Sequence, residues 1–211
     1  MTEGAAPGPD LRVRHRPVQQ RGRVRFDAIL ASARELLAQR GLEGFTIDDV
    51  AAHAGIPVGS IYQYFPNKFA IVAELDARDT FSLIDDLLAN AARFPSDEWQ
   101  TETDALIDLV AAHWVDDPSR RAVWLAMRST AATRSLAAEH SRALVATLLP
   151  MVARLAQRRS PAEQVAICEV VVEMCQSLLH FSVSDGRPNP ATVTELKRML
   201  RAYLRAVFLE P

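Results

Sequence analysis

The sequence predicts an all-α protein, in which a three-helix N-terminal domain precedes a larger helical C-terminal domain, with about nine helices in total. Apolar residues recur every three or four positions along most of the chain, as they do on one face of a helix. Helix caps and Gly or Pro stops divide this pattern into segments, and we find no alternating run that predicts a strand. We expect three parts, residues 1–22, 23–68 and 69–211.

The composition is typical of a soluble globular protein. The 211 residues are 49% hydrophobic, which is enough for a sizeable core. The first residues lack the apolar stretch of a signal peptide, and the longest charge-free apolar run, residues 143–153, is shorter than the roughly 18 residues of a membrane-spanning helix. We therefore expect a cytoplasmic protein that does not contact a membrane.

The N-terminal part of the chain is basic, although the net charge is −2. Residues 11–70 hold nine Lys or Arg against five Asp or Glu, and six of these bases are arginines between Arg12 and Arg25. Such a segment suits a polyanion such as DNA, but a disordered solubilising tail has the same composition. Residues 1–22 are predicted to be a flexible basic arm with one of these two roles.

The three helices of the N-terminal domain are predicted between residues 23 and 68. The first covers residues 23–40 and ends at Gly41. Thr46 and Asp49 form a capping box that starts the second helix, and Gly55 ends it. Pro57 begins the third helix, because a missing N–H costs nothing in a first turn. Two short helices that meet at a glycine turn form a helix-turn-helix, whose second helix enters the DNA major groove.

Polar and small residues of the third predicted helix are expected to face outward. Gln63 can hydrogen-bond an adenine edge, while the hydroxyls of Ser60, Tyr62 and Tyr64 can reach phosphates. Lys68 adds a positive charge at the start of the next helix. Helical hairpins are also common as purely structural units, in which case the tyrosines would be packing residues.

A longer stretch carries a family resemblance. Residues 23–72, RVRFDAILASARELLAQRGLEGFTIDDVAAHAGIPVGSIYQYFPNKFAIV, closely resemble the DNA-binding region of the TetR family of bacterial transcriptional regulators. The motifs FTIDDVA, AGIPVGSIYQYF and PNK occur in that family's order and spacing. The sequence departs from the family at Pro57, where serine is frequent, and at Phe69, where an acidic residue is frequent.

The resemblance implies a homodimer that binds a palindromic double-stranded DNA operator. By position it assigns DNA contacts to these residues: Thr46, Val58, Gly59, Ser60, Tyr62, Gln63, Tyr64 and Lys68. The arginines of the arm, which include Arg21 and Arg23, are expected to follow the DNA backbone or to enter a narrow minor groove.

Six helices are predicted in the C-terminal part, over residues 68–93, 96–115, 118–131, 134–159 with a kink at Pro150, 161–184 and 190–208. The last two are apolar on more than one face. This pattern favours the homodimerisation that the resemblance implies, with these two helices at the interface; the alternative is that both helices are plain core.

The resemblance also implies a cavity for a small-molecule effector among the C-terminal helices. The candidate lining residues are Trp99, His113, Trp114, Trp124, Met127, Arg128, Met151, Met174 and Cys175, with His113 or Arg128 orienting the ligand. Their apolar excess favours a hydrophobic or aromatic effector. Each of them is also suited to ordinary core packing.

The sequence contains no motif for catalysis or metal binding that we can identify. A Gly-x-Ser-x-Gly elbow, a metalloprotease helix and a dinucleotide fingerprint are all missing. Cys168 and Cys175 lie about 10 Å apart along one predicted helix, too far for a disulfide. We predict a ligand-responsive repressor without enzymatic activity, cofactor or metal; the alternatives are a helical interaction protein or an uncharacterised enzyme that reuses the helix-turn-helix.

Overall fold

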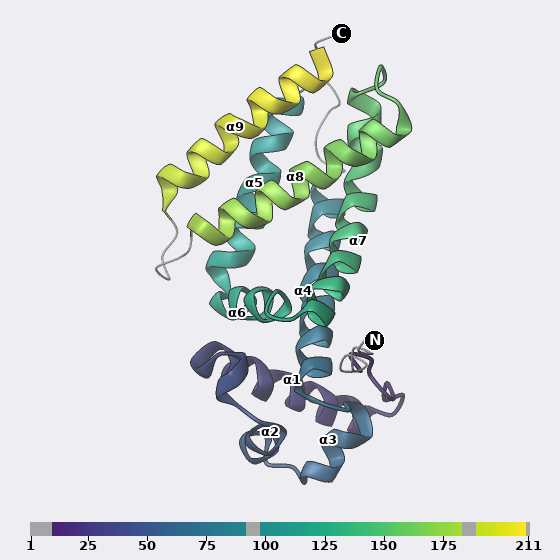
Figure 1. Cartoon of the computed structure of the whole chain (residues 1–211), viewed down its shortest axis with the longest axis vertical. Coiled ribbons are helices and arrows are strands. Elements are labelled where there is room, and N and C mark those ends of the chain that lie inside the picture. Colours follow the sequence, from purple (N-terminus) through teal and green to yellow (C-terminus); the bar gives the residue numbers. More distant parts are fainter. Residues whose placement is uncertain (1–9, 92–97, 183–188, 210–211) are drawn as a thin grey trace, which may run out of the picture. The chain divides into compact units, whose positions relative to one another are not determined.

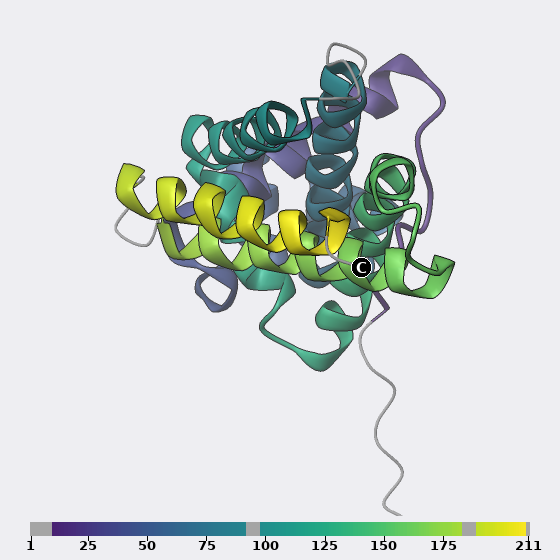
Figure 2. The same cartoon turned by 90° about the horizontal axis from the view of Figure 1, so that it is seen from above.

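The computed structural model describes residues 10–91, 98–182 and 189–209, and all regular structure in these ranges is helical (Figures 1 and 2). The elements in chain order are α1 (Gln20–Arg40), η1 (Leu42–Gly44), α2 (Ile47–Ala54), α3 (Val58–Tyr64), α4 (Lys68–Ala91), α5 (Trp99–Asp116), α6 (Pro118–Met127), α7 (Ala131–Leu155), α8 (Pro161–Ser182) and α9 (Pro190–Leu209). The predicted all-α class is confirmed.

Most helix boundaries lie within a few residues of their predicted positions. The largest differences are at the end of α7, which is Leu155 instead of residue 159, and at the end of α6. This helix ends at Met127 instead of residue 131. The amides of Arg128 and Ser129, directly after the helix, donate to the carbonyls of residues 125 and 126, and the Thr130 hydroxyl accepts a hydrogen bond from the Thr133 amide at 3.2 Å. A threonine cap therefore starts α7 at Ala131, and Pro150 lies inside that helix. The predicted helix ends at residues 93 and 184 and the predicted start at 96 lie outside the described residues.

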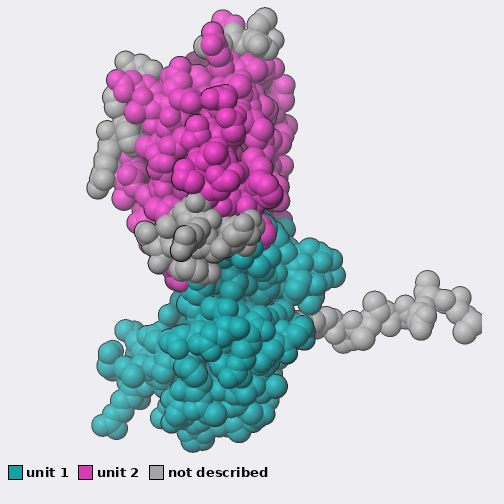
Figure 3. All heavy atoms as spheres, turned by 90° about the vertical axis from the view of Figure 1, so that its left-hand side faces the viewer, with its two compact units in different colours: residues 1–78, 119–138 teal, residues 79–118, 139–211 magenta. Residues whose placement is uncertain are grey.

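The chain packs as two compact units, which Figure 3 shows in separate colours. The first unit comprises residues 1–78 and 119–138, and the second comprises residues 79–118 and 139–211. This division differs from the predicted boundary at residues 68/69. The reason is that Val123, Ala126, Met127 and Ala137 belong to the hydrophobic core of the first unit.

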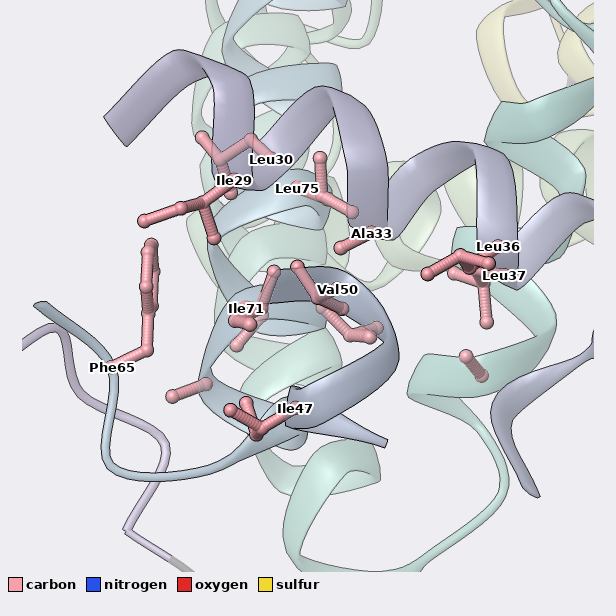
Figure 4. Close-up of a cluster of buried hydrophobic side chains, with 14 of the residues drawn as sticks. Ile29, Leu30, Ala33, Leu36, Leu37, Ile47, Val50, Phe65, Ile71 and Leu75 are labelled. Carbon is pink, nitrogen blue, oxygen red and sulfur yellow. The ribbon is translucent and has the colours of Figure 1, made fainter. Parts of the chain in front are cut away.

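The core of the first unit fixes α2 and α3 against α1 and the first turns of α4 (Figure 4). Ile29 and Ala33 of α1 are fully buried, as is Val50 of α2. Phe26 stacks on Phe65 with ring centroids 4.9 Å apart. Burying an aromatic pair of this kind is worth about 0.5–1.5 kcal/mol beyond its area. The helix-turn-helix thus rests on a rigid base.

The core of the second unit is formed mainly by α5, α8 and α9, with contributions from α4 and α7. Helices α8 and α9 lie side by side in both ribbon views (Figures 1 and 2). Among the described helices, α8 alone is long and apolar enough to cross a membrane by length and composition, a test that core helices also pass. Its residues Ile167, Cys168 and Leu179 are buried in the core.

Candidate functional sites

The second helix, α2, is held by the predicted capping box. The Thr46 hydroxyl accepts a hydrogen bond from the Asp49 amide at 3.2 Å, and the Asp49 carboxylate accepts from the Thr46 amide at 2.8 Å. Hydrogen bonds from the Thr46 hydroxyl and amide hold the pKa of Asp49 below its ordinary value. The carboxylate is therefore ionised at neutral pH, where the box is complete.

The turn between α2 and α3 depends on one glycine. Gly55 has φ +65° and ψ +34°, in the left-handed region, and its amide caps the end of α2 by bonding to the carbonyls of residues 51 and 52. A side chain at this position would be strained. Pro57 follows in extended conformation and precedes the first residue of α3, Val58. The turn therefore sets the angle at which α3 leaves α2.

One face of α3 is open to solvent and carries the side chains that the sequence assigns to DNA. Val58, Gly59, Tyr62 and Gln63 are exposed, and Ser60 is half-buried. Apart from the chain neighbours of Gly59 and the backbone of its own helix, no atom of the described residues lies within 4 Å of the position where a Cβ would stand. The face is small and apolar at its start and carries a phenol and an amide one turn later, so it can approach a base edge closely and then hydrogen-bond to it.

Two residues of the predicted DNA-facing set are used inside the unit instead. Tyr64 is only 6% exposed, and its ring meets Phe26 edge to face with centroids 5.5 Å apart. The Lys68 ammonium donates to the carbonyls of Leu42 at 2.7 Å and Phe45 at 3.2 Å. Lys68 therefore satisfies the carbonyls of the η1 turn, a role that helical spacing alone could not distinguish from phosphate binding.

The arm is predicted to be flexible. Its described part, residues 10–19, instead packs on other residues of the first unit. The Arg14 amide donates to the Tyr64 carbonyl at 2.8 Å, and the Arg14 guanidinium donates to the Tyr62 carbonyl at 2.9 Å. The Arg16 guanidinium forms two hydrogen bonds with the buried Glu74 carboxylate, at 2.8 and 2.7 Å. This pairing could not be predicted from local sequence, because the two residues are 58 positions apart.

The remaining arginines assigned to DNA lie at the start of α1. Arg21 and Arg23 are both exposed, and α1 begins at Gln20, so both are helical and not part of an extended arm. Thr46 is also exposed at the start of α2. Apart from Tyr64 and Lys68, the structure thus leaves the predicted DNA-contacting residues, eight in all, on the surface or half-buried at it: Arg21, Arg23, Thr46, Val58, Gly59, Ser60, Tyr62 and Gln63.

A cavity of about 110 Å³ lies within the second unit. Side chains of α4, α5, α7, α8 and α9 surround it, and most of them are leucine, isoleucine or valine. Trp99, Met151 and Cys175 are the predicted pocket residues that line it. A cavity of this size and character suits a small apolar ligand.

The other predicted pocket residues lie elsewhere. Met127 is fully buried in the core of the first unit. Trp124 and Arg128 belong to the same unit and form a cation–π contact, with the guanidinium carbon 3.7 Å from the ring centroid. His113, Trp114 and Met174 belong to the second unit but do not line the cavity. His113 lies 3.3 Å from Asp86, and the ring of Trp114 contacts that of His180. Met174 packs against the core. Helical spacing thus predicted which side chains are apolar and face inward, but not which of the two units each helix packs in.

Glu102 is a cavity residue that the sequence did not single out. It is 3% exposed and lines the cavity from α5, and its Oε2 is 3.4 Å from the Arg154 guanidinium. In a sequence with many acidic residues, nothing marked this one as buried. Within the described part of the chain, no group of three or more His, Cys, Asp or Glu side chains is placed to hold a metal ion.

Comparisons with known proteins cover most of the chain. A family model described as "Bacterial regulatory proteins, tetR family" matches residues 29–75, and one described as "Tetracyclin repressor-like, C-terminal domain" matches residues 97–208. The HTH-type transcriptional regulator EthR of Mycobacterium tuberculosis is 33% identical over 118 residues, which are 54% of either protein. The chain thus spans about half the length of this curated relative.

Solved structures share the fold at low sequence identity. The fatty acid degradation regulator FadR from Bacillus halodurans has a TM-score of 0.72 at 17% identity and covers 86% of this chain and 96% of its own. FadR from Bacillus subtilis, solved in complex with stearoyl-CoA, has a TM-score of 0.70 at 16% identity and covers 88% and 99%. At these identities the likeness concerns the fold alone.

Proposed function

The chain belongs to the TetR family of bacterial regulatory proteins, and we propose that it is a DNA-binding transcription regulator, a repressor that a small apolar effector releases from its operator. The observation that carries this proposal is the exposed face of α3, held at a fixed angle by the capping box and by Gly55. The second unit supports the ligand-responsive part, because it contains an apolar cavity.

The exposed residues of α3 have separate tasks in this proposal. Val58 and Gly59 bring the backbone close to the groove, and the Gln63 amide pairs with an adenine edge. The hydroxyls of Ser60 and Tyr62 bind phosphates and so fix the position of the helix on the DNA. The positive charges of Arg21 and Arg23 also bind phosphates. Thr46 lies near a phosphate at the start of α2. Tyr64 and Lys68 act indirectly, by holding the unit together.

The proposed regulator is a homodimer through α8 and α9, which places two α3 helices in successive major grooves about 34–36 Å apart. Val170 and Phe181 of α8 support this interface, because they are 43% and 64% exposed and lie on one face of the helix. An effector that binds more tightly to a dimer with another spacing of the two helices would weaken DNA binding. A difference of about 1.4 kcal/mol in its affinity for the two conformations is enough for a tenfold loss of DNA affinity.

Effector chemistry does not transfer from the neighbours. The Bacillus subtilis FadR structure holds stearoyl-CoA, a large anionic thioester, whereas the cavity here is about 110 Å³ and has a buried carboxylate in its wall. The family consists of regulators, which favours this role over that of an enzyme or a structural interaction protein. A cytoplasmic location accords with a role on DNA.

The test is binding of the purified full chain to DNA that flanks its own coding region, at two salt concentrations. We expect binding that weakens with salt, because contacts to phosphates release counterions. Gln63→Ala and Tyr62→Ala should each weaken it, whereas the control Gln100→Ala, at an exposed position of α5, should not. Salt-sensitive binding without preference for this DNA would place the operator elsewhere, and failure to bind any DNA would overturn the proposal.

A further inference from the structure

The cavity wall contains one acceptor that the protein leaves unused. Glu102 is 3% exposed and lines the cavity, and its Oε1 is buried without a hydrogen-bond partner among the described residues. Its other oxygen, Oε2, is 3.4 Å from a guanidinium nitrogen of Arg154, whose side chain is partly exposed. The carboxylate is therefore half-satisfied, by one long contact to its other oxygen.

The neighbouring polar groups do not explain the free oxygen. The Thr103 hydroxyl, also in the cavity wall, donates to the Trp99 carbonyl at 2.7 Å and is thereby occupied. Gln176 is the other polar side chain of the lining, and it has interactions of its own. The remaining lining residues are aliphatic, aromatic or sulfur-containing. A buried acceptor without a donor is costly, and more so when it is charged, so native structures rarely keep one without a reason.

Three kinds of ligand can be compared at this wall. A purely apolar ligand would displace water and leave Oε1 without any partner in a dry cavity. An anionic ligand would bring a second negative charge beside Glu102, which is unfavourable even with Arg154 close by. A cationic N–H donor would instead give Oε1 a charge-assisted hydrogen bond.

We propose that the cavity binds a small apolar molecule that carries an ammonium group, and that Glu102 is the residue that selects for it. This inference rests on the proposed function, in which the cavity is the effector site. An apolar cavity of roughly 150 Å³ accommodates benzene, a ring of six carbons, so the 110 Å³ here limits the apolar body of the ligand to about six carbons at most.

Hexylamine, hexanol and hexanoate form a matched set that tests the proposal, because they share one chain and differ in the head group. Calorimetric titration into the full-length protein should show hexylamine binding roughly ten- to a hundredfold more tightly than hexanol, as expected for a hydrogen bond to a charged group. Hexanoate should bind most weakly. Equal affinity for the three, or tightest binding of hexanoate, would overturn the proposal.

Two substitutions on α5 separate the role of Glu102 from the general effect of removing a carboxylate. Glu102→Gln should lower the affinity for hexylamine at least about tenfold and change that for hexanol little. Asp104→Asn is the matched control, since Asp104 is also paired with an arginine, Arg201 at 3.2 Å, and also has a buried oxygen without a partner, yet it does not line the cavity. Similar losses in both variants would contradict the assignment.

Circular dichroism of each variant establishes that it is folded, and the three ligands on the unaltered protein decide the matter if Glu102→Gln does not fold. The titrations contain no DNA. Failure of hexylamine to bind therefore overturns this inference alone, whereas failure to bind DNA overturns the proposed regulator alone.

Discussion

At the scale of single residues, the pairing of Arg16 with Glu74 changes the role of the arm. Glu74 lies on α4 with 5% of its surface exposed, and two nitrogens of Arg16 bind its two oxygens. Arg78 adds a longer contact of 3.5 Å. A buried carboxylate of this kind requires compensation, and the arm supplies most of it. An arginine that composition assigns to DNA thus stabilises the protein.

Replacement of Arg16 by alanine should therefore destabilise the fold. We expect a loss of about 1–2 kcal/mol in the free energy of unfolding, below the value for a fully buried pair because Arg16 itself is largely exposed. Urea denaturation measures it. Arg12→Ala, at an exposed position of the same arm, is the control and should leave stability nearly unchanged. Equal losses in the two variants would show that the pairing with Glu74 is unimportant.

The two cysteines should be unreactive in the folded protein. Burial raises the pKa of Cys175 to about 12 and that of Cys168 to about 11. Because the thiolate is the reactive form, at pH 8 a thiol with a pKa near 12 labels roughly a thousandfold more slowly than a free cysteine. Labelling by a chromogenic disulfide in buffer and in urea measures this difference. Rapid labelling of Cys175 in buffer would mean that the cavity opens readily.

At the scale of elements, the segment from α2 to α3 contains two glycines that differ in whether the backbone tolerates a side chain. Gly55 has a positive φ that a side chain resists, whereas Gly59 lies inside α3 with ordinary helical geometry and open space around it. In a helix interior glycine is less stable than alanine. Gly59 therefore costs stability, which is understandable if close approach to DNA requires it.

Paired alanine substitutions test this contrast. Gly55→Ala should lower the free energy of unfolding by about 1–2 kcal/mol, because its backbone is left-handed. Gly59→Ala should raise it by about 0.5–1 kcal/mol and yet weaken DNA binding. Thermal unfolding and a DNA titration of both variants measure these effects. Undiminished DNA binding by Gly59→Ala would remove that residue from the proposed contact surface.

The helices and the turn could be predicted from the sequence because their causes are local. The capping box of Thr46 and the stop at Gly55 involve residues within a few positions of one another. By contrast, the contacts of Lys68 with the η1 turn and the position of Met127 in the first core depend on segments brought together only by folding. Glu102 was missed for the same reason, since its burial results from the packing of several helices.

At the scale of the whole molecule, the exposed apolar face of α8 predicts assembly. Phe181 is 64% exposed and shares a helix face with Val170. A surface of this kind is normally covered by a partner. The same helix lines the cavity with Val171 and Cys175. One helix would then connect the ligand to the proposed dimer interface, which is the connection that a ligand-responsive dimer needs.

Phe181→Glu should convert the proposed dimer to a monomer, because it would bury a charge in an apolar interface. Sedimentation velocity over a range of protein concentrations measures the mass. Phe81→Glu is the control, since Phe81 is similarly exposed, at 60%, but lies on α4. A Phe181→Glu protein that remained dimeric would place the interface elsewhere, as would dissociation by Phe81→Glu alone.

The border between the two packing units passes through the helices α4 and α7, since residues 78/79 and 138/139 lie within them. A gene fusion that joined the first 78 codons to a foreign sensor would omit residues 119–138, and with them Val123 and Met127 of the first core. Recombination at residue 78 therefore cannot transfer the DNA-binding unit with a complete core. New sensing in such a chain is reached more readily by single substitutions in the cavity wall than by exchange of domains.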